Sequence, residues 1–135
     1  MNHFRYPVTI FPVGCFSLIN SDLFLKLSDM GHVFDFSEAV NYEQWFNKPQ
    51  NKLAFELETQ LMRDMLQPMH GESVLDIGCG AGACLTAFLE MGLRVTGLDP
   101  STYMLDMAFG KIGHRADLYR GYAEDLPLEI GRAHV

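Results

Sequence analysis

The feature that most constrains this chain is an apolar run that ends in an acid and continues into alternating glycines. Residues 74–82 read Val-Leu-Asp-Ile-Gly-Cys-Gly-Ala-Gly, and residues 83–90 continue with a helical pattern. A short apolar run bounded by glycines predicts a buried strand. Glycine supplies the positive φ and the missing Cβ that let backbone approach a ligand closely. The sequence therefore predicts a strand, a glycine loop and a helix that hold a ligand against backbone.

Two classes of cofactor fit the spacing of these glycines. Gly78, Gly80 and Ala83 satisfy the relaxed dinucleotide fingerprint G-x-G-x-x-G/A. Asp76 separates the two classes, because its carboxylate would repel a pyrophosphate and attract a ligand that carries an ammonium group. S-adenosylmethionine carries such a group. A nicotinamide-dependent oxidoreductase is the alternative, and selective binding of a nicotinamide dinucleotide would support it.

Two more acidic strand ends follow along the chain. Residues 94–98 form a predicted strand that ends in Asp99, and an acid in that position typically hydrogen-bonds ribose hydroxyls. Residues 119–122 lead into Glu124 and Asp125, which we expect at the end of a third strand. One of these two carboxylates can accept a hydrogen bond from an adenine amino group there. Both cofactor classes use the second acid, so Asp99 does not discriminate between them.

In their order along the chain, these motifs resemble those of the class I S-adenosylmethionine-dependent methyltransferases. The resemblance is greatest to the small-molecule branch, the methyltransferases of type 11 and of ubiquinone and menaquinone biosynthesis. It covers residues from about 36 to 128 and rests on Asp76-x-Gly78-Cys79-Gly80-x-Gly82, Leu98-Asp99-Pro100-Ser101-x-x-Met104 and Ala123-Glu124-Asp125-Leu126-Pro127. The resemblance implies an α/β fold with a Rossmann-like, doubly wound sheet, and S-adenosylmethionine as cofactor.

The resemblance also implies a role for each motif. In that family the glycine loop lies beside the methionine part of the cofactor, the first acid is linked to its ammonium and the second to the ribose hydroxyls. The Glu-Asp pair is linked to the adenine, and a Tyr-x-x-Trp-Phe segment lies over the pocket, so Tyr42 and Trp45 are candidates to close it. The implied cofactor-binding residues are Asp76, Gly78, Gly80, Gly82, Asp99, Ser101, Met104, Glu124, Asp125 and Tyr42.

Each of these residues also has a purely structural interpretation. The glycines can form only a tight turn, and Asp76 can cap the helix that follows. Ser101 is placed to cap a helix, Met104 is of a type that commonly packs in a core, and Glu124 with Asp125 can form a solvated turn. The aromatic residues of the Tyr-x-x-Trp-Phe segment can equally be core. Agreement of three motifs in the expected order favours the cofactor site.

Two helices are expected before the glycine loop, separated by a break at residues 47–49. The second ends before Pro68 and carries an apolar stripe at steps of four residues. The stripe consists of Leu53, Leu57, Leu61 and Met65, widened by Phe55, Met62 and Leu66. We predict that this face packs on the sheet.

The chain is expected to divide into four segments. Residues 1–30 are interpreted as an N-terminal extension that precedes a start at Met30, residues 31–70 as N-terminal helices, residues 71–128 as a partial cofactor-binding domain, and residues 129–135 as a non-native tail. Only strands 3-2-1 of a doubly wound sheet are then present, which leaves the first strand with an unpaired edge. We therefore interpret the chain as an N-terminal fragment of a methyltransferase. The alternative is a non-catalytic interaction module that keeps the cofactor loop.

Charge and composition exclude several kinds of partner. A net charge of −7 argues against nucleic acid, because such binders need clustered Lys and Arg. The apolar residues 7–19 are too few to span a bilayer and contain two prolines, so we expect no stable membrane insertion. Three cysteines and five scattered histidines lack metal-ligand spacing, which predicts no metal site and a reducing cytoplasm. A small-molecule methyl acceptor is expected. Since methyl transfer needs chiefly alignment of the acceptor, we nominate no catalytic residue.

Overall fold

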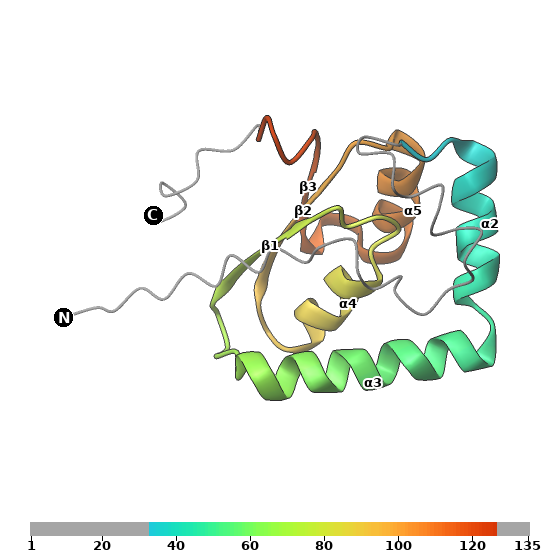
Figure 1. Ribbon diagram of the computed structural model, residues 1–135. Helices are drawn as coiled ribbons and strands as arrows, with labels where there is room; N and C mark the ends of the chain where they lie inside the picture. Colours follow the sequence, from blue (N-terminus) through green and yellow to red (C-terminus); the bar gives the residue numbers. More distant parts are fainter. Residues whose placement is uncertain (1–32, 127–135) are drawn as a thin grey trace.

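The computed structural model describes residues 33–126, in which three strands and their connecting helices form the centre (Figure 1). The elements are α2 (Phe36–Phe46), α3 (Pro49–Leu66), β1 (Ser73–Ile77), α4 (Ala83–Glu90), β2 (Arg94–Asp99), α5 (Thr102–Ile112), the 3-10 turn η2 (Gly113–Arg115) and β3 (Asp117–Arg120). The strands are parallel and lie in the order β1-β2-β3. The predicted α/β class and the strand order 3-2-1 are confirmed. The expectations for residues 1–30 and 129–135 fall outside the described residues.

The register of the sheet brings the predicted acids to one edge. Asp76 pairs with Gly97, and Asp99 pairs with Arg120. Because the carboxyl ends of parallel strands meet at the same edge, both acids lie where a doubly wound fold binds its ligand. The third strand lies two residues earlier than predicted, so Glu124 and Asp125 follow β3 through a short turn instead of ending it.

The core lies between the sheet and the two helices α4 and α5. Leu85 and Phe88 of α4 are fully buried, and their apolar surface stabilises the packing of this helix on β1 and β2. The core cluster consists of Val74, Cys79, Leu85, Phe88, Leu93, Val95, Ala108 and Ile112. At its centre a Cβ added to Gly97 would lie 3.0 Å from atoms of Cys79, Leu85 and Leu118, so the loop, α4 and β3 all pack against the bare backbone of β2.

Local signals determine where the helices begin. Asp35 and Glu38 form a capping box at the start of α2, with hydrogen bonds of 2.9 and 3.0 Å. Pro49 is the first residue of α3. Proline has no N–H group, but an N–H in this first position would have no hydrogen-bond partner within the helix. Ser101 caps α5, as the sequence predicted, and accepts a hydrogen bond from the Met104 N–H at 3.3 Å.

The prediction that the leucine stripe of α3 packs on the sheet is wrong. Leu57 and Met65 are 64% and 75% exposed, and Leu53 and Leu61 are also largely exposed. Helices α4 and α5 already cover the face of the sheet on which the core lies, and α3 runs past α4 in Figure 1. Of the residues that widen the predicted stripe, Met62 does pack against the core, so the helix contacts the body through the side that carries Met62 and not through the four residues of the stripe's centre. Within residues 33–126 no helix is both long and apolar enough to cross a membrane.

Candidate cofactor-binding site

The glycine loop turns directly out of β1 at the carboxyl edge of the sheet. Gly78 and Gly80 have φ values of +78° and +53°, which side chains other than glycine rarely adopt. The N–H groups of Gly78 and Cys79 both donate to the Leu98 carbonyl, at 2.7 and 3.0 Å. These bonds fix the loop to the end of β2 and bring it beside Asp99.

The loop glycines serve two different purposes. A Cβ added at Gly78 or Gly80 would meet no described atom within 4 Å, so these two residues leave open backbone that a ligand can approach. A Cβ added at Gly82 would lie 3.0 Å from the Cβ of Ala108. Gly82 therefore allows the first turn of α4 to pack closely against α5.

The Asp99 carboxylate organises the loop from the end of β2. Its Oδ2 accepts from the Gly80 N–H at 2.9 Å, and its Oδ1 accepts from the Ser101 N–H at 2.8 Å. Burial raises the pKa of Asp99, and these two N–H donors oppose that shift. Each carboxylate oxygen has a second lone pair, so the group can still accept from ligand hydroxyls.

Asp76 differs from Asp99 because part of its carboxylate has no partner. The residue is 3% exposed, and its Oδ2 is buried with no hydrogen-bond donor among the described residues. Desolvation, and then the nearby Asp99 charge, raise the pKa of Asp76 to about 6. Asp76 does not cap α4. The N-cap residue of this helix is Gly82, and no side chain forms a capping hydrogen bond there. The structural interpretation of Asp76 is therefore wrong, and a buried acceptor in this position fits a cationic donor such as the ammonium of S-adenosylmethionine.

Ser101 and Met104 both have structural contacts. The Ser101 hydroxyl donates to the Phe34 carbonyl at 2.6 Å, besides capping α5, and the residue is 1% exposed. Met104 is buried in a small cluster with Ala39 and Ala81. These contacts account for both residues without a ligand, and their predicted positions near the adenine stay predictions.

Helix α2 lies against the glycine loop. Tyr42 packs on the cluster that contains Ala81 of the loop, and its ring stacks on Trp45 with centroids 6.3 Å apart. The structure thus brings Tyr42 to the loop, and its part in closing the pocket stays a prediction. Glu124 and Asp125 are exposed in a turn, and the neighbouring Gly121 N–H donates to the Asp99 carbonyl at 3.2 Å.

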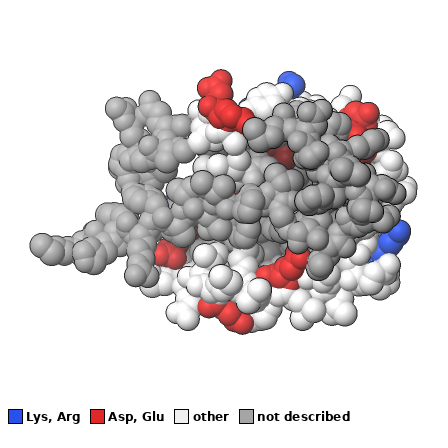
Figure 2. Space-filling view, in the orientation of Figure 1, with Lys and Arg blue, Asp and Glu red and all other residues white. Residues whose placement is uncertain are grey.

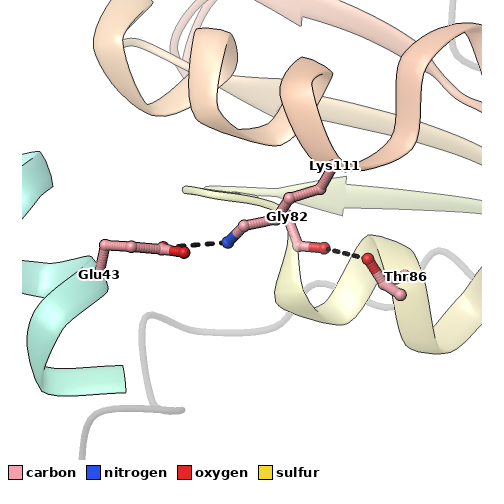
Figure 3. A network of polar contacts seen from close by, with 4 residues as sticks. All are labelled: Glu43, Gly82, Thr86 and Lys111. Atoms are coloured by element: carbon pink, nitrogen blue, oxygen red, sulfur yellow. Dashed lines mark hydrogen bonds and ion pairs between the residues drawn. The ribbon is translucent and has the colours of Figure 1, made fainter. Parts of the chain in front are cut away.

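Two contacts beside the loop were not predicted from the sequence (Figure 3). Lys111 of α5 forms an ion pair with Glu43 of α2, with Nζ and Oε2 3.0 Å apart. The Thr86 hydroxyl of α4 donates to the Gly82 carbonyl at 3.1 Å. The first joins residues 68 positions apart, which no local pattern can predict.

Comparison with known proteins identifies the family. Residues 74–135, which include the glycine loop, β2 and all of β1 except Ser73, match the family model described as a methyltransferase domain. The match supports the recognition of this part of the chain as a domain of the class I S-adenosylmethionine-dependent methyltransferases. The chain is thus a methyltransferase by family, and S-adenosylmethionine is the cofactor of that family. The sequence-based recognition is confirmed.

The individual relatives match less than half of this chain. An uncharacterized methyltransferase of Mycobacterium tuberculosis is 38% identical over 66 residues, which are 49% of this chain and 27% of that protein. A protein named ubiquinone biosynthesis O-methyltransferase, from Paracidovorax citrulli, is 44% identical over 45 residues, 33% of this chain and 19% of that protein. The chain thus spans about a quarter of the length, or less, of these curated relatives.

A solved structure supports the fold of the methyltransferase. The crystal structure named as the [4+2]-cyclase SpnF matches with a TM-score of 0.51 and 25% sequence identity. The match covers 61% of this chain and 32% of that chain.

Proposed function

We propose that the chain binds S-adenosylmethionine at the carboxyl edge of its sheet and is the cofactor-binding part of a methyltransferase that acts on a small-molecule acceptor. The observation that carries the proposal is the buried Oδ2 of Asp76, which has no donor among the described residues. It lies at the end of β1, beside a loop whose first two glycines leave their backbone open. A ligand with an ammonium group would supply the missing donor.

The other residues would divide the cofactor between them. Asp99, held by the Gly80 and Ser101 N–H groups, would accept from the ribose hydroxyls. Glu124 or Asp125 would accept from the adenine amino group, and Tyr42 would cover the methionine end. When bound, the cofactor supplies a methyl group that its sulfonium already activates. These residues bind and orient it and help to exclude water.

A small-molecule acceptor is supported by charge and by the relatives. On the face that Figure 2 shows, acidic side chains are spread over the visible described surface and basic ones gather into no patch. Such a surface does not suit a phosphate backbone. The relative named ubiquinone biosynthesis O-methyltransferase also points to a small acceptor. The thiol of Cys79, which forms no disulfide within the described residues, suits the reducing cytoplasm in which we place the protein.

A second candidate function follows from the solved structure of similar fold. Its name is that of a cyclase, so this fold does not by itself determine the reaction. A chain that binds the cofactor without methyl transfer would correspond to the non-catalytic module considered from the sequence. Binding and turnover must therefore be measured separately.

Calorimetric titration with S-adenosylhomocysteine tests the binding site. The full chain should bind it, and Asp76→Asn should weaken binding by about 10- to 100-fold, because a hydrogen bond to a charged group contributes about 1.5–3 kcal/mol. Asp106→Asn, at an exposed position of α5, is the matched control and should leave the affinity unchanged. Circular dichroism verifies that all three proteins are folded.

Two results would contradict the proposal. Equal affinity of the chain and Asp76→Asn would show that Asp76 does not bind the ammonium group. Preference for a nicotinamide dinucleotide over S-adenosylhomocysteine would favour an oxidoreductase instead.

A further inference from the structure

A cavity of about 640 Å³ that is open to solvent lies between the helices, separate from the edge that carries the acids. Residues of α2, α3 and α4 line it together with Lys111 of α5, and neither Asp76 nor Asp99 is among them. Its volume is within the range of about 300–1,000 Å³ that is typical of small-molecule sites. The residues that form it come from four elements, so the cavity is a feature of the tertiary fold.

The interior of the cavity suits an apolar body. Phe46 and Phe55 meet edge to face, with ring centroids 5.2 Å apart. Ala83 and Ala87 of α4 also belong to the lining. Short alanine side chains leave room beside the aromatic pair, and an aromatic or aliphatic group of a ligand would fill that room.

One polar group of a lining residue has no partner among the described residues. The Oγ1 of Thr59 is buried and makes no hydrogen bond with the described residues. A helical threonine commonly donates to the carbonyl four residues earlier, as Thr86 does to Gly82 in the same cavity lining (Figure 3). A buried hydroxyl without a partner costs about 1–3 kcal/mol. A polar group of a ligand in the cavity would satisfy it.

The charges around the cavity are of both signs. Glu43 and Lys111 are paired with each other. The remaining charged residues of the lining are Lys52, Arg63, Glu56 and Glu90, and no ion pair joins any of them to a described residue. All four are exposed. Two cations and two anions that have no ion-pair partner among the described residues favour a ligand that carries one charge of each sign over a ligand with a net charge.

We propose that this cavity binds a zwitterionic small molecule with an apolar body, of the chemical class of an aromatic amino acid, and that its occupancy is coupled to the glycine loop. The coupling would pass through α4, because Thr86 of the lining holds the carbonyl of Gly82, the last glycine of the loop. The Glu43–Lys111 pair joins α2 to α5 across the same cavity. Any such coupling must be reciprocal between the two ligands.

Titration of the full chain with L-phenylalanine, followed by amide NMR, tests the site. Amides of Phe55, Thr59 and Thr86 should shift with one dissociation constant. Thr59→Val should raise that constant about fivefold, since one hydrogen bond contributes about 1 kcal/mol. The same variant should unfold at an equal or higher temperature, because it removes an unpaired hydroxyl. Thr102→Val, at an exposed position of α5, is the matched control and should change neither quantity.

Two related compounds test the zwitterionic class. 3-Phenylpropanoate and 2-phenylethylamine have the same apolar body with a single charge each, and both should bind more weakly than L-phenylalanine. Equal or tighter binding of either compound would overturn the assignment of the ligand class. If the three amides do not shift at about 10 mM L-phenylalanine, the site itself is overturned. The dissociation constant would then be well above about 10 mM, which is too weak for a specific site. Thr59→Leu, which fills the cavity, should abolish the shifts.

The coupling has its own measurement. Saturation with L-phenylalanine should change the affinity for S-adenosylhomocysteine, and S-adenosylhomocysteine should change the affinity for L-phenylalanine by the same factor. If the chain binds no S-adenosylhomocysteine, shifts of the Gly78 and Gly80 amides on addition of L-phenylalanine report the coupling instead. Unchanged glycine amides and unchanged affinities would overturn it.

Discussion

At the scale of single residues, two neighbouring carboxylates of this methyltransferase domain have opposite surroundings. Asp99 accepts from two backbone N–H groups, whereas one oxygen of Asp76 has no donor among the residues that the structure describes. Burial raises the pKa of both carboxyls, and for Asp76 it reaches about 6. The partnered acid organises the loop, and the unpartnered one is left to be completed by a ligand.

The raised pKa of Asp76 predicts how stability depends on pH. Between about pH 4 and pH 6 the folded chain binds a proton at Asp76 that the unfolded chain releases, so this group stabilises the fold most at low pH and least above pH 6. The loss amounts to at most about 3 kcal/mol. Urea unfolding at several pH values should show that Asp76→Asn gains stability relative to the parent chain as the pH rises.

Ligand affinity should have the opposite pH dependence. S-adenosylhomocysteine should bind more tightly as the pH rises through 6, because its ammonium group then meets an ionised Asp76. The account of Asp76 would be contradicted if the free energies of unfolding of the parent chain and Asp76→Asn differed by the same amount at all pH values.

The loop glycines predict a graded effect of alanine. Gly82→Ala combines a positive φ of +88° with a Cβ contact of 3.0 Å to Ala108, so it should destabilise the chain by about 2–4 kcal/mol. Gly80→Ala, with only the backbone cost, should lose about 1–2 kcal/mol. Thermal and urea unfolding measure the difference. If Gly80→Ala lost more stability than Gly82→Ala, the close packing of α4 on α5 would not be the reason for glycine at position 82.

At the scale of elements, Ser101 connects two helices that are distant in sequence. Its hydroxyl caps α5 and binds the Phe34 carbonyl just before α2. Ser101→Ala should therefore destabilise the chain by about 1–3 kcal/mol, more than the loss of a cap alone. Lys111→Met removes only a half-exposed ion pair and should cost less than about 1 kcal/mol. Chemical unfolding of both variants compares them, and equal losses would contradict the role of the Ser101–Phe34 bond.

The orientation of α3 predicts which of its apolar residues stabilise the fold. Leu57→Gln should leave the free energy of unfolding within about 0.5 kcal/mol, because this side chain is largely exposed. Met62→Ala should cost about 1–3 kcal/mol, because Met62 packs against the core. The reverse order would show that the leucine face is the packed one.

Local rules explain what the sequence could predict in these elements. The break before Pro49, the cap at Ser101 and the turn through Gly78 and Gly80 each depend on a few adjacent residues, and all were predicted. The orientation of α3 was not, because an apolar stripe indicates a buried face without indicating which surface lies beside it. The Glu43–Lys111 contact and the unpaired Thr59 hydroxyl depend on tertiary packing, and no spacing in the sequence indicates them.

At the scale of the whole molecule, β2 is the best supported strand. It pairs with β1 on one side and with β3 on the other, and four of its six residues are buried. In the described part of the chain β1 and β3 each pair on one side only, and β3 has no buried residue. Cooperative opening should therefore begin away from β2.

Hydrogen exchange followed by mass spectrometry measures this order. Peptides that contain residues 95–98 should exchange the most slowly, and peptides of β3 should exchange faster by one to several orders of magnitude, about tenfold for each 1.4 kcal/mol. Addition of S-adenosylhomocysteine should slow amide hydrogen exchange most in the glycine loop. Faster exchange in β2 than in β3 would contradict the central position of β2 in the stability of the fold.

The crowding around Gly97 affects how a mutational scan of this protein would look. A side chain there would press on side chains of the loop, α4 and β3 at once, so substitution should lower both the amount of folded protein and its ligand binding, and larger side chains should lower them more. Substitution of Asp76 should lower binding while the amount of folded protein stays level or rises. A scan that measured activity alone would find the same loss for substitutions of Gly97 and of Asp76. A scan that scored abundance beside activity would separate the residue that shapes the sheet from the residue that meets the cofactor.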